Sequence, residues 1–220
     1  MTILNETHDP GLRSWVNSAN EDDTDFPVQN LPFGVYTDPE TGTGKVGIAI
    51  GDMVLDVTAA RAKGIIGGAA DDAAGACAGE TLNQLMAMGG RHWSALRAAA
   101  SMALRNNTED GEAAKEVADD ILVAQADVTM RLPARIGDYT DFYSSIFHAT
   151  NVGKMLRPDN PLMPNYKYIP IAYHGRSSSI RASGTPSKRP LGQLKSQDVD
   201  TPVLDACKRL DYETELGIFI

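Results

Sequence analysis

Residues 137–151 gather the side chains of this sequence that are best suited to acid–base chemistry. The run contains two carboxylates, two phenols and an imidazole. Histidine has an ordinary pKa of about 6.5, close to neutral pH, so His148 is the candidate general base. Asp141 and Tyr143 are two residues apart and would share one face of an extended chain. The competing interpretation is structural, because aspartates and serines often only build turns.

A second group of carboxylates lies near the end of the sequence, at Asp211, Glu213 and Glu215. The alternation over residues 209–220 predicts a strand, which would place the three on one face. Adjacent carboxylates repel one another unless a cation lies between them. Oxygen ligands suit Mg²⁺ or Ca²⁺ rather than Zn²⁺. A solvated acidic edge strand is the alternative, although the apolar residues 216–220 indicate a strand that enters a core.

Other motifs exclude some enzyme classes. Residues 173–179 hold several serines but lack the Gly-x-Ser-x-Gly spacing of a nucleophile elbow, and no phosphate-binding loop is present. Arg157 could bind a carboxylate through two hydrogen bonds, although spacing alone favours an ordinary surface charge.

The first half of the sequence predicts a small antiparallel sheet over residues 26–58. Strands are expected to begin at Val35 and to cover 45–50 and 53–57. The last two are joined by a two-residue turn at 51–52, which is typical of a hairpin.

Helical spacing of apolar residues follows the sheet. It covers residues 81–89 and 93–104, and a shorter helix is expected over 112–121. Thr81 is the expected N-cap of the first helix and Gly89 its expected end. The Ala- and Gly-rich stretch between the sheet and these helices carries little signal.

Composition narrows the possible functions. The formal net charge of −9 argues against general binding of nucleic acid or of anionic membranes. Cys77 and Cys207 fit no metal-ligand spacing and suggest a reduced protein. Residues 1–25 are polar, are expected to form a mobile end or an edge, and lack a signal peptide. A soluble, cytoplasmic protein is therefore expected.

Taken in order, these motifs resemble the fumarylacetoacetase family. The matching blocks are 25–32 and 47–52, DYTDFYSS at 138–145, HATNVG at 148–153, YHGR at 173–176, SGTP at 183–186, and the acidic cluster from Leu210 to Glu215. The resemblance covers nearly the whole sequence.

The resemblance implies a mostly β fold with some α. Residues 1–132 would form an SH3-like N-terminal β-barrel with appended helices, and 133–220 the truncated start of a mixed β-roll catalytic domain. It also implies a homodimer. The implied activity is hydrolysis of the carbon–carbon bond of fumarylacetoacetate to fumarate and acetoacetate, in tyrosine and phenylalanine breakdown.

The resemblance also assigns roles to residues. His148 would be the base that activates water, and the substrate, a small β-diketo acid, would be bound by Tyr143, Arg157 and Tyr173. A divalent ion, Mg²⁺ or Ca²⁺, would be bound by Asp141, Glu213 and Glu215. In the family a further metal-binding Asp, a catalytic Lys and a Glu that orients the base lie beyond residue 220. This chain is therefore expected to be an inactive or nearly inactive fragment.

Two alternatives remain. One is another hydrolase of the same superfamily, such as an acylpyruvate hydrolase or a related decarboxylase. The other is a non-catalytic interaction module in which the N-terminal part binds a partner protein.

Overall fold

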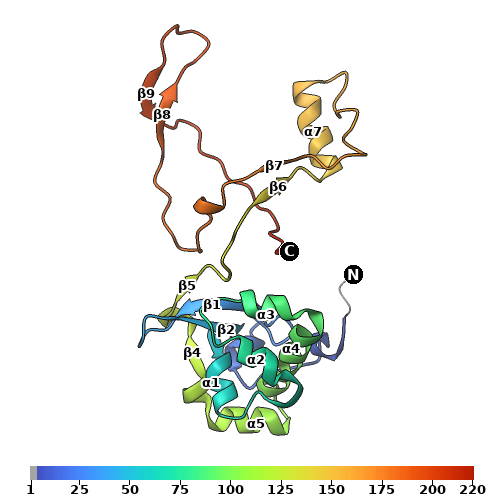
Figure 1. Cartoon of the computed structure of the whole chain (residues 1–220), viewed down its shortest axis with the longest axis vertical. Helices are drawn as coiled ribbons and strands as arrows, with labels where there is room; N and C mark the ends of the chain where they lie inside the picture. Colours follow the sequence, from blue (N-terminus) through green and yellow to red (C-terminus); the bar gives the residue numbers. More distant parts are fainter. Residues whose placement is uncertain (1–3) are drawn as a thin grey trace. The chain divides into compact units, whose positions relative to one another are not determined.

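The computed structural model, drawn in Figure 1, describes residues 4–220. These residues form two units that divide after Ser183. Residues 1–3, part of the predicted N-terminal end, lie outside the described residues. The protein is a mixed α/β structure with antiparallel sheets. Within residues 4–220, α-helices contain more residues than strands, so the predicted mostly β composition was wrong.

The first unit contains a five-stranded antiparallel sheet with the order β4-β3-β2-β1-β5. Its strands are β1 (Phe33–Thr37), β2 (Gly44–Ile50), β3 (Met53–Asp56), β4 (Leu122–Ala124) and β5 (Thr129–Arg131). The predicted meander at residues 26–58 is confirmed, with Gly51 at a positive φ of 54° in the β2–β3 turn. The two edge strands were not predicted.

The sheet does not close into the predicted SH3-like barrel. β4 and β5 lie at opposite edges and, within the described residues, do not pair with each other. Yet only residues 125–128 connect them, and a chain of that length reaches roughly 18 Å. A flat sheet of five strands is about 19 Å wide. Residues 125–127 of this connection form a 3₁₀ helix, which rises only about 2 Å per residue, so the connection spans well under that width and the sheet is curved. Each edge strand is only three residues long and offers few backbone N–H and C=O groups through which the two edges could pair.

Six α-helices belong to the same part of the chain: α1 (Val57–Ala62), α2 (Asp71–Ala76), α3 (Asn83–Met88), α4 (Gly90–Leu104), α5 (Glu109–Glu116) and α6 (Ala118–Ile121). The helices predicted over 81–89 and 93–104 are present as α3 and α4, and Gly89, at a φ of 83°, ends α3 as expected. The single helix predicted over 112–121 is instead two helices, α5 and α6, separated at Val117. Thr81 does not cap α3, because Leu82 occupies the N-cap position. Helices α1 and α2 lie largely in the Ala- and Gly-rich stretch, for which the sequence pattern predicted no secondary structure.

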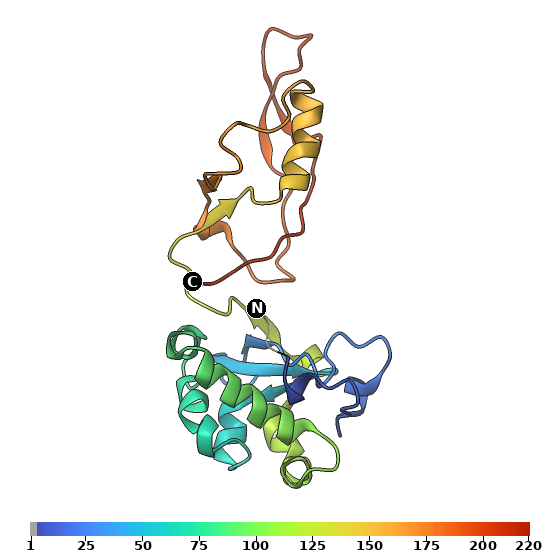
Figure 2. The same cartoon turned by 90° about the vertical axis from the view of Figure 1, so that its right-hand side faces the viewer.

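The hydrophobic core lies between the sheet and these helices. On β2, the side chains of Val46, Ile48 and Ile50 are fully buried on one face, two residues apart. α4 contributes Leu96 and Leu104 to the same cluster. Helix α4 contacts α2, α3 and α5, and Figures 1 and 2 show it among them. This part of the chain therefore has its own core.

The polar N-terminal segment, over residues 4–25, makes hydrogen bonds to the end of α4. Ser14 Oγ donates to the carbonyl of Leu104 at 2.6 Å, and Trp15 Nε1 donates to that of Ala103 at 2.8 Å. These bonds satisfy carbonyls at the end of α4 that have no partner within the helix.

A charged network lies at one end of the three central strands, where β1 ends, β2 begins and β3 ends. Lys45 Nζ is 2.5 Å from Asp38 Oδ2 and 3.0 Å from Asp56 Oδ2, and Tyr36 Oη donates to the same Asp56 oxygen at 3.0 Å. Both carboxylates are nearly fully buried. Hydrogen bonding to Asp38 raises the pKa of Lys45, and the Lys45 ammonium in turn lowers the pKa of Asp38. The single Lys45 ammonium therefore forms ion pairs with two buried carboxylates.

The rest of the first unit contains β6 (Thr140–Phe142), α7 (Ile146–Leu156) and β7 (Ala172–His174). Five 3₁₀ helices are also present among the described residues: η1 (Glu6–His8), η2 (Asn17–Asn20), η3 (Gly68–Ala70), η4 (Gln125–Asp127) and η5 (Ser177–Ser179).

Within residues 4–220, no helix combines the length and apolarity that crossing a bilayer requires.

The second unit has one antiparallel ribbon, formed by β8 (Leu191–Leu194) and β9 (Val203–Ala206). Residues 207–220 have no regular secondary structure, so the strand predicted over 209–220 is absent. A strand needs a neighbour to pair its backbone groups, and no described segment pairs with this one.

Candidate functional site

The β6–β7 ribbon places Asp141 directly opposite Tyr173. The ribbon is extended at one end by the bond from Tyr143 N to Ile171 O, at 2.9 Å. At the other end Gly175 N donates to the carbonyl of Tyr139 at 2.8 Å. The two predicted site residues from distant parts of the sequence thus become neighbours across a ribbon.

The Asp141 carboxylate is bound by two phenols. Tyr173 Oη donates to Asp141 Oδ2 at 2.7 Å, and Tyr139 Oη donates to the same oxygen at 3.0 Å. Gly175 permits this arrangement, because the Tyr139 ring lies against its backbone. Hydrogen bonds to an ionised acceptor are stronger than neutral ones, so the ribbon holds Asp141 in a defined orientation.

A second polar pair lies beside the first. His174 Nε2 is 3.1 Å from Asp138 Oδ1, and both side chains are exposed to solvent. Exposed pairs of this kind contribute little to stability.

Helix α7 positions His148. The chain enters the helix through Ser145, whose Oγ accepts a hydrogen bond from His148 N at 3.3 Å. His148 therefore lies in the first turn, and its side chain is exposed. The N-cap explains why the DYTDFYSS run ends in serine just before the helix begins.

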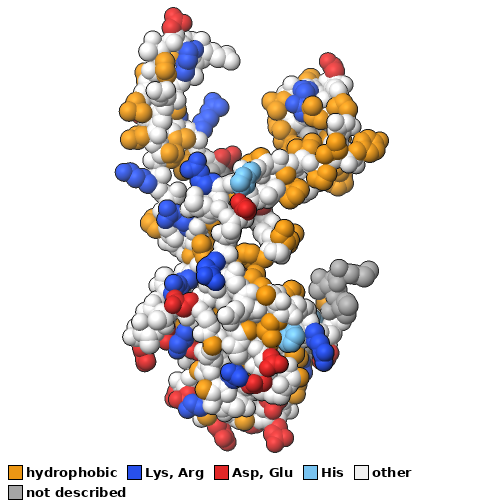
Figure 3. Space-filling view, in the orientation of Figure 1, with side chains coloured by type: hydrophobic (Ala, Val, Ile, Leu, Met, Phe, Trp, Pro, Cys, Tyr) orange, Lys and Arg blue, Asp and Glu red, His pale blue; other side chains and the backbone are white. Residues whose placement is uncertain are grey.

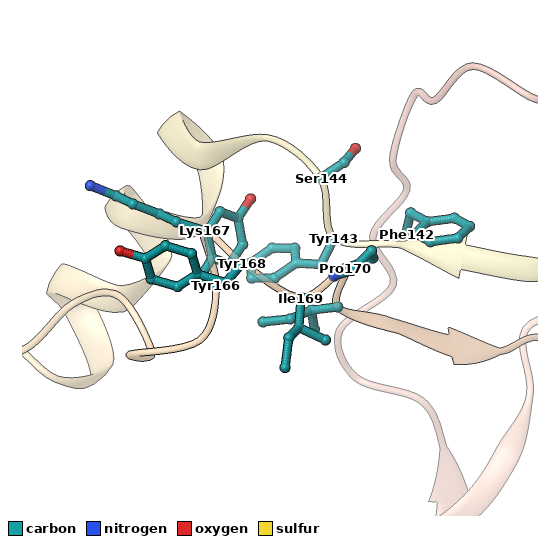
Figure 4. Close-up of a pocket in the computed structure, with 9 residues that line it drawn as sticks. Phe142, Tyr143, Ser144, Tyr166, Lys167, Tyr168, Ile169 and Pro170 are labelled. Atoms are coloured by element: carbon teal, nitrogen blue, oxygen red, sulfur yellow. The ribbon is translucent and has the colours of Figure 1, made fainter.

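Tyr143 connects the helix to a pocket. Its ring meets the His148 ring edge to face, with centroids 5.5 Å apart and planes at 83°. It meets the Tyr166 ring in the same way at 6.1 Å and 85°. Such edge-on contacts are favourable for aromatic rings. Figure 4 shows the Tyr143 ring beside the Tyr166 side chain, while Lys167 extends away from both.

The pocket has a volume of about 310 Å³. It is lined by Phe142, Tyr143, Ser144 and residues 166–171. The Tyr166 hydroxyl is shielded from solvent and has no hydrogen-bond partner within the described residues. A shielded hydroxyl without a partner is costly, so it favours a ligand that brings a polar atom to it.

Arg157 lies at the other end of α7 from His148. It is the C-cap residue, nine positions further along, which corresponds to roughly 13 Å of helix rise. Its Nη2 donates to the carbonyl of Pro161 at 3.4 Å. The structure does not bring Arg157 and His148 together.

The described residues do not form a metal site. Within residues 4–220, no group of three His, Cys, Asp or Glu side chains is arranged to hold an ion. Asp141 is bound by tyrosines, and Glu213 and Glu215 belong to the irregular segment of the second unit.

The sequence pattern assigned no role to two residues that the structure places in the site. Tyr166 reaches Tyr143 from the loop after α7, and no local periodicity marks it. Gly175 lies in the YHGR motif, where only the closeness of Tyr139 explains the glycine. A glycine directly after a strand is a signal of close backbone approach that could have found it.

Comparison with known proteins gives the family. A sequence profile described as "Fumarylacetoacetase N-terminal" matches residues 29–133. The chain is 44% identical over 211 residues to a fumarylacetoacetase of Dictyostelium discoideum, a match that covers 95% of this chain and 49% of the relative. It is 42% identical over 207 residues to the human protein of that name, covering 90% and 48%.

The chain belongs to the fumarylacetoacetase family. A plant member, from Arabidopsis thaliana, is 37% identical over 213 residues, covering 95% of this chain and 49% of its own. The chain spans about half the length of the curated fumarylacetoacetases that it matches. The matches extend well beyond the N-terminal profile and therefore include much of residues 136–220.

Proposed function

We propose that this chain supplies part of the active site of a fumarylacetoacetase, which hydrolyses fumarylacetoacetate to fumarate and acetoacetate in tyrosine and phenylalanine breakdown. The main support is a match over 90–95% of the chain to proteins of that name. On this proposal the chain is a catalytic fragment that is inactive, or nearly so, by itself.

The observation that carries the proposal is the placement of His148. A helix N-cap fixes its backbone, and Tyr143 contacts its ring edge to face. Its side chain is open to solvent, so a water molecule can reach it. A candidate base that is accessible and held from two sides suits general base catalysis.

In the proposed reaction, an imidazole nitrogen of His148 takes a proton from water. The oxygen of that water forms a bond to a carbonyl carbon of the β-diketone. The carbon–carbon bond then breaks, and its electron pair leaves with the acetoacetate fragment as an enolate. The His148 imidazolium returns its proton to the enolate carbon. The other fragment departs as fumarate after its new carboxylic acid releases a proton to solvent. Water is the only co-reactant, and atoms and charge balance.

Tyr143, Tyr173 and Arg157 are the proposed substrate-binding residues. The phenols of Tyr143 and Tyr173 can donate hydrogen bonds to substrate oxygens. The substrate is anionic and the chain carries a net charge of −9, so a local cation is required. The Arg157 guanidinium can bind a carboxylate through two hydrogen bonds.

Further parts of the proposal concern assembly and architecture. The profile match ends at residue 133, which supports a domain boundary near 132 and a catalytic domain over 133–220. The family resemblance would add an SH3-like arrangement for the curved sheet, a mixed β-roll for the catalytic domain, a homodimer and a cytoplasmic location. It would also add an Mg²⁺ or Ca²⁺ ion bound by Asp141, Glu213 and Glu215.

Turnover of fumarylacetoacetate, followed by loss of its ultraviolet absorbance, tests the proposal. Three proteins are compared: this chain, this chain joined to the unmatched half of the Dictyostelium relative, and the joined protein with His148→Ala. We expect turnover only in the second, and a loss on the order of 100-fold or more in the third, because general base catalysis contributes that much. Isothermal titration with Mg²⁺ and Ca²⁺ tests the metal separately.

Three outcomes would each contradict part of the proposal. A joined protein that folds but hydrolyses acylpyruvates and leaves fumarylacetoacetate intact would favour the superfamily relative. A joined protein that hydrolyses neither, and whose N-terminal part captures a partner protein, would favour an interaction module. Full activity of this chain alone would contradict the fragment interpretation.

A further inference from the structure

Two phenols share a single oxygen of the Asp141 carboxylate. Tyr173 Oη donates to Asp141 Oδ2 at 2.7 Å, and Tyr139 Oη donates to the same atom at 3.0 Å. A carboxylate oxygen offers two lone pairs, so these two donors occupy both acceptor positions of Oδ2. Any further group that binds this oxygen must therefore take the place of one of the phenols.

The Tyr139 side chain is held in place by Gly175. Gly175 N donates to the carbonyl of Tyr139 at 2.8 Å, which fixes the backbone at this end of the ribbon. The ring lies so close to Gly175 that a Cβ atom at position 175 would overlap it. Tyr139 is also half-buried. A change of rotamer would break this packing, so we expect the Tyr139 hydroxyl to stay on Asp141.

The Tyr173 side chain is far more open. Tyr173 is 65% exposed, and its hydrogen bond to Asp141 lies at the surface. Figure 3 shows a histidine and an acidic side chain at the surface where Figure 1 places the β6–β7 ribbon. Exposed side chains change rotamer within picoseconds to nanoseconds. Tyr173 can therefore leave Asp141 without disturbing the hydrophobic core, to which it does not belong.

The proposed role of Tyr173 requires such a departure. A phenol carries one O–H group and donates one hydrogen bond at a time. In the structure that bond goes to Asp141, whereas substrate binding would direct it to a substrate oxygen. When Tyr173 turns to the substrate, Asp141 keeps the hydrogen bond from Tyr139. The carboxylate then remains oriented, because hydrogen bonds to ionised acceptors are strong ones.

We propose that the two phenols divide these tasks. Tyr139 is a positioning residue that holds Asp141 throughout, and Tyr173 exchanges between Asp141 and the substrate. The inference rests on the proposed function for the role of Tyr173 toward the substrate. Without substrate, Tyr173 occupies the carboxylate oxygen together with Tyr139, and with substrate bound, Tyr139 alone orients it.

Side-chain NMR on this chain tests the exchange without any substrate. Tyrosines labelled with ¹³C in the ring give an order parameter for each ring. We expect roughly 0.85 for Tyr139, as in rigid backbone, and less than roughly 0.6 for Tyr173. Tyr139→Phe keeps the ring against Gly175 and removes only the hydroxyl. The order parameter of Tyr173 is expected to rise in this variant, because Tyr173 no longer shares Oδ2 with a second donor.

Turnover by the joined protein separates the two roles. Tyr173→Phe removes a substrate contact, so we expect KM to rise about tenfold while kcat changes less than about threefold. Tyr139→Phe leaves Asp141 without a phenol once Tyr173 has turned to the substrate. For that variant we expect kcat to fall about tenfold while KM changes less than about threefold. The two variants are matched, because each removes one hydroxyl from the same carboxylate oxygen.

Two results would overturn the division of tasks. One is equal order of the two rings in the chain alone, or a Tyr139 ring that is the more mobile. The other is full kcat in Tyr139→Phe with impaired kcat in Tyr139→Leu, because the ring alone would then be required. The proposed function is judged separately. Unequal rings without turnover by the joined protein leave the difference between the phenols standing and remove its substrate. Equal rings with turnover of fumarylacetoacetate do the reverse.

Discussion

The Tyr139 ring lies directly against the backbone of Gly175. A Cβ atom at position 175 would come within 2.0 Å of Cδ1 of that ring, far inside contact distance. The ring in turn brings Tyr139 Oη to Asp141. The close contact with the Tyr139 ring, 36 positions earlier in the chain, therefore requires glycine at position 175. Because Tyr139 binds Asp141, the same glycine helps to position a proposed site carboxylate.

A methyl group at position 175 should displace this ring. For Gly175→Ala in the joined protein we expect turnover to fall on the order of tenfold to 100-fold, because small misplacements of site groups are that costly. The ring-proton chemical shifts of Tyr139, measured by NMR, should change as well. Gly192→Ala is the control, since a Cβ at Gly192 meets nothing within 4 Å. Unchanged Tyr139 shifts in Gly175→Ala would contradict the prediction.

Lys45 should stabilise the N-terminal part by more than an ordinary surface lysine. Lys45→Met leaves Asp38 and Asp56 buried without the ammonium that they share. We expect the free energy of unfolding in urea to fall by about 2 kcal/mol, below the value for a fully buried pair because the Lys45 side chain is 36% exposed. Lys63→Met is the matched control, because its pair with Asp120 is exposed and should contribute less than about 1 kcal/mol. Equal losses in the two variants would argue against the network.

The same network predicts how stability depends on pH. The pKa of Asp38 is lowered chiefly by Lys45, and that of Asp56 is lowered because hydrogen bonds outweigh burial. Their contribution is present above the unfolded pKa of about 3.9 and is lost as the pH falls through the folded values. The pKa of Lys45 is raised, so its contribution is present below about 10.4 and is lost at higher pH.

The urea midpoint measured from pH 2 to pH 12 checks this expectation. We expect a plateau between about pH 5 and pH 10 and a fall on either side. Burial and the neighbouring Asp56 also raise the pKa of Tyr36, which adds to the fall at high pH. Tyr36→Phe separates the tyrosine from the lysine. A Lys45→Met profile that is as steep at both ends as that of the unaltered chain would rule out the network as the cause.

The two thiols should react differently. Cys77 is buried in the core, where burial raises the pKa of its thiol to about 12. Cys207 is only partly buried. With a disulfide reagent at pH 8 we expect one thiol to react quickly in the folded chain and the second only after denaturation, because the thiolate is the reactive form. Cys207→Ser should remove the fast phase. Two fast thiols would indicate that the core around Cys77 opens.

Local pattern was enough to predict part of the fold. The β1–β2–β3 meander follows from alternation and a Gly-Asp turn, and α4 from apolar spacing after Gly89. β4 and β5 were missed because they are three residues long and pair with strands more than 60 positions away. The strand predicted at 209–220 is absent because a strand needs a neighbouring strand to pair with, and alternation of apolar residues alone does not provide one.

The site shows the same limit. Asp141 and Tyr143 were expected to share a face, and their closeness to His148 could be read from the sequence. The sequence did not indicate that Tyr173 would lie across a ribbon from Asp141, 32 positions away. Nor did it indicate that Tyr166 would fold back onto Tyr143. Contacts between distant segments depend on the course of the chain between them.

The position of the hydrophobic core in the chain has a consequence for synthesis on the ribosome. The core ends at Ile121, and its sheet is complete once β5 has emerged. The N-terminal part can therefore fold while translation continues. The segment that follows, residues 142–171, leaves Phe147, Met155 and Leu156 exposed. On a nascent chain, exposed apolar side chains of this kind form the surface to which chaperones bind and through which chains aggregate.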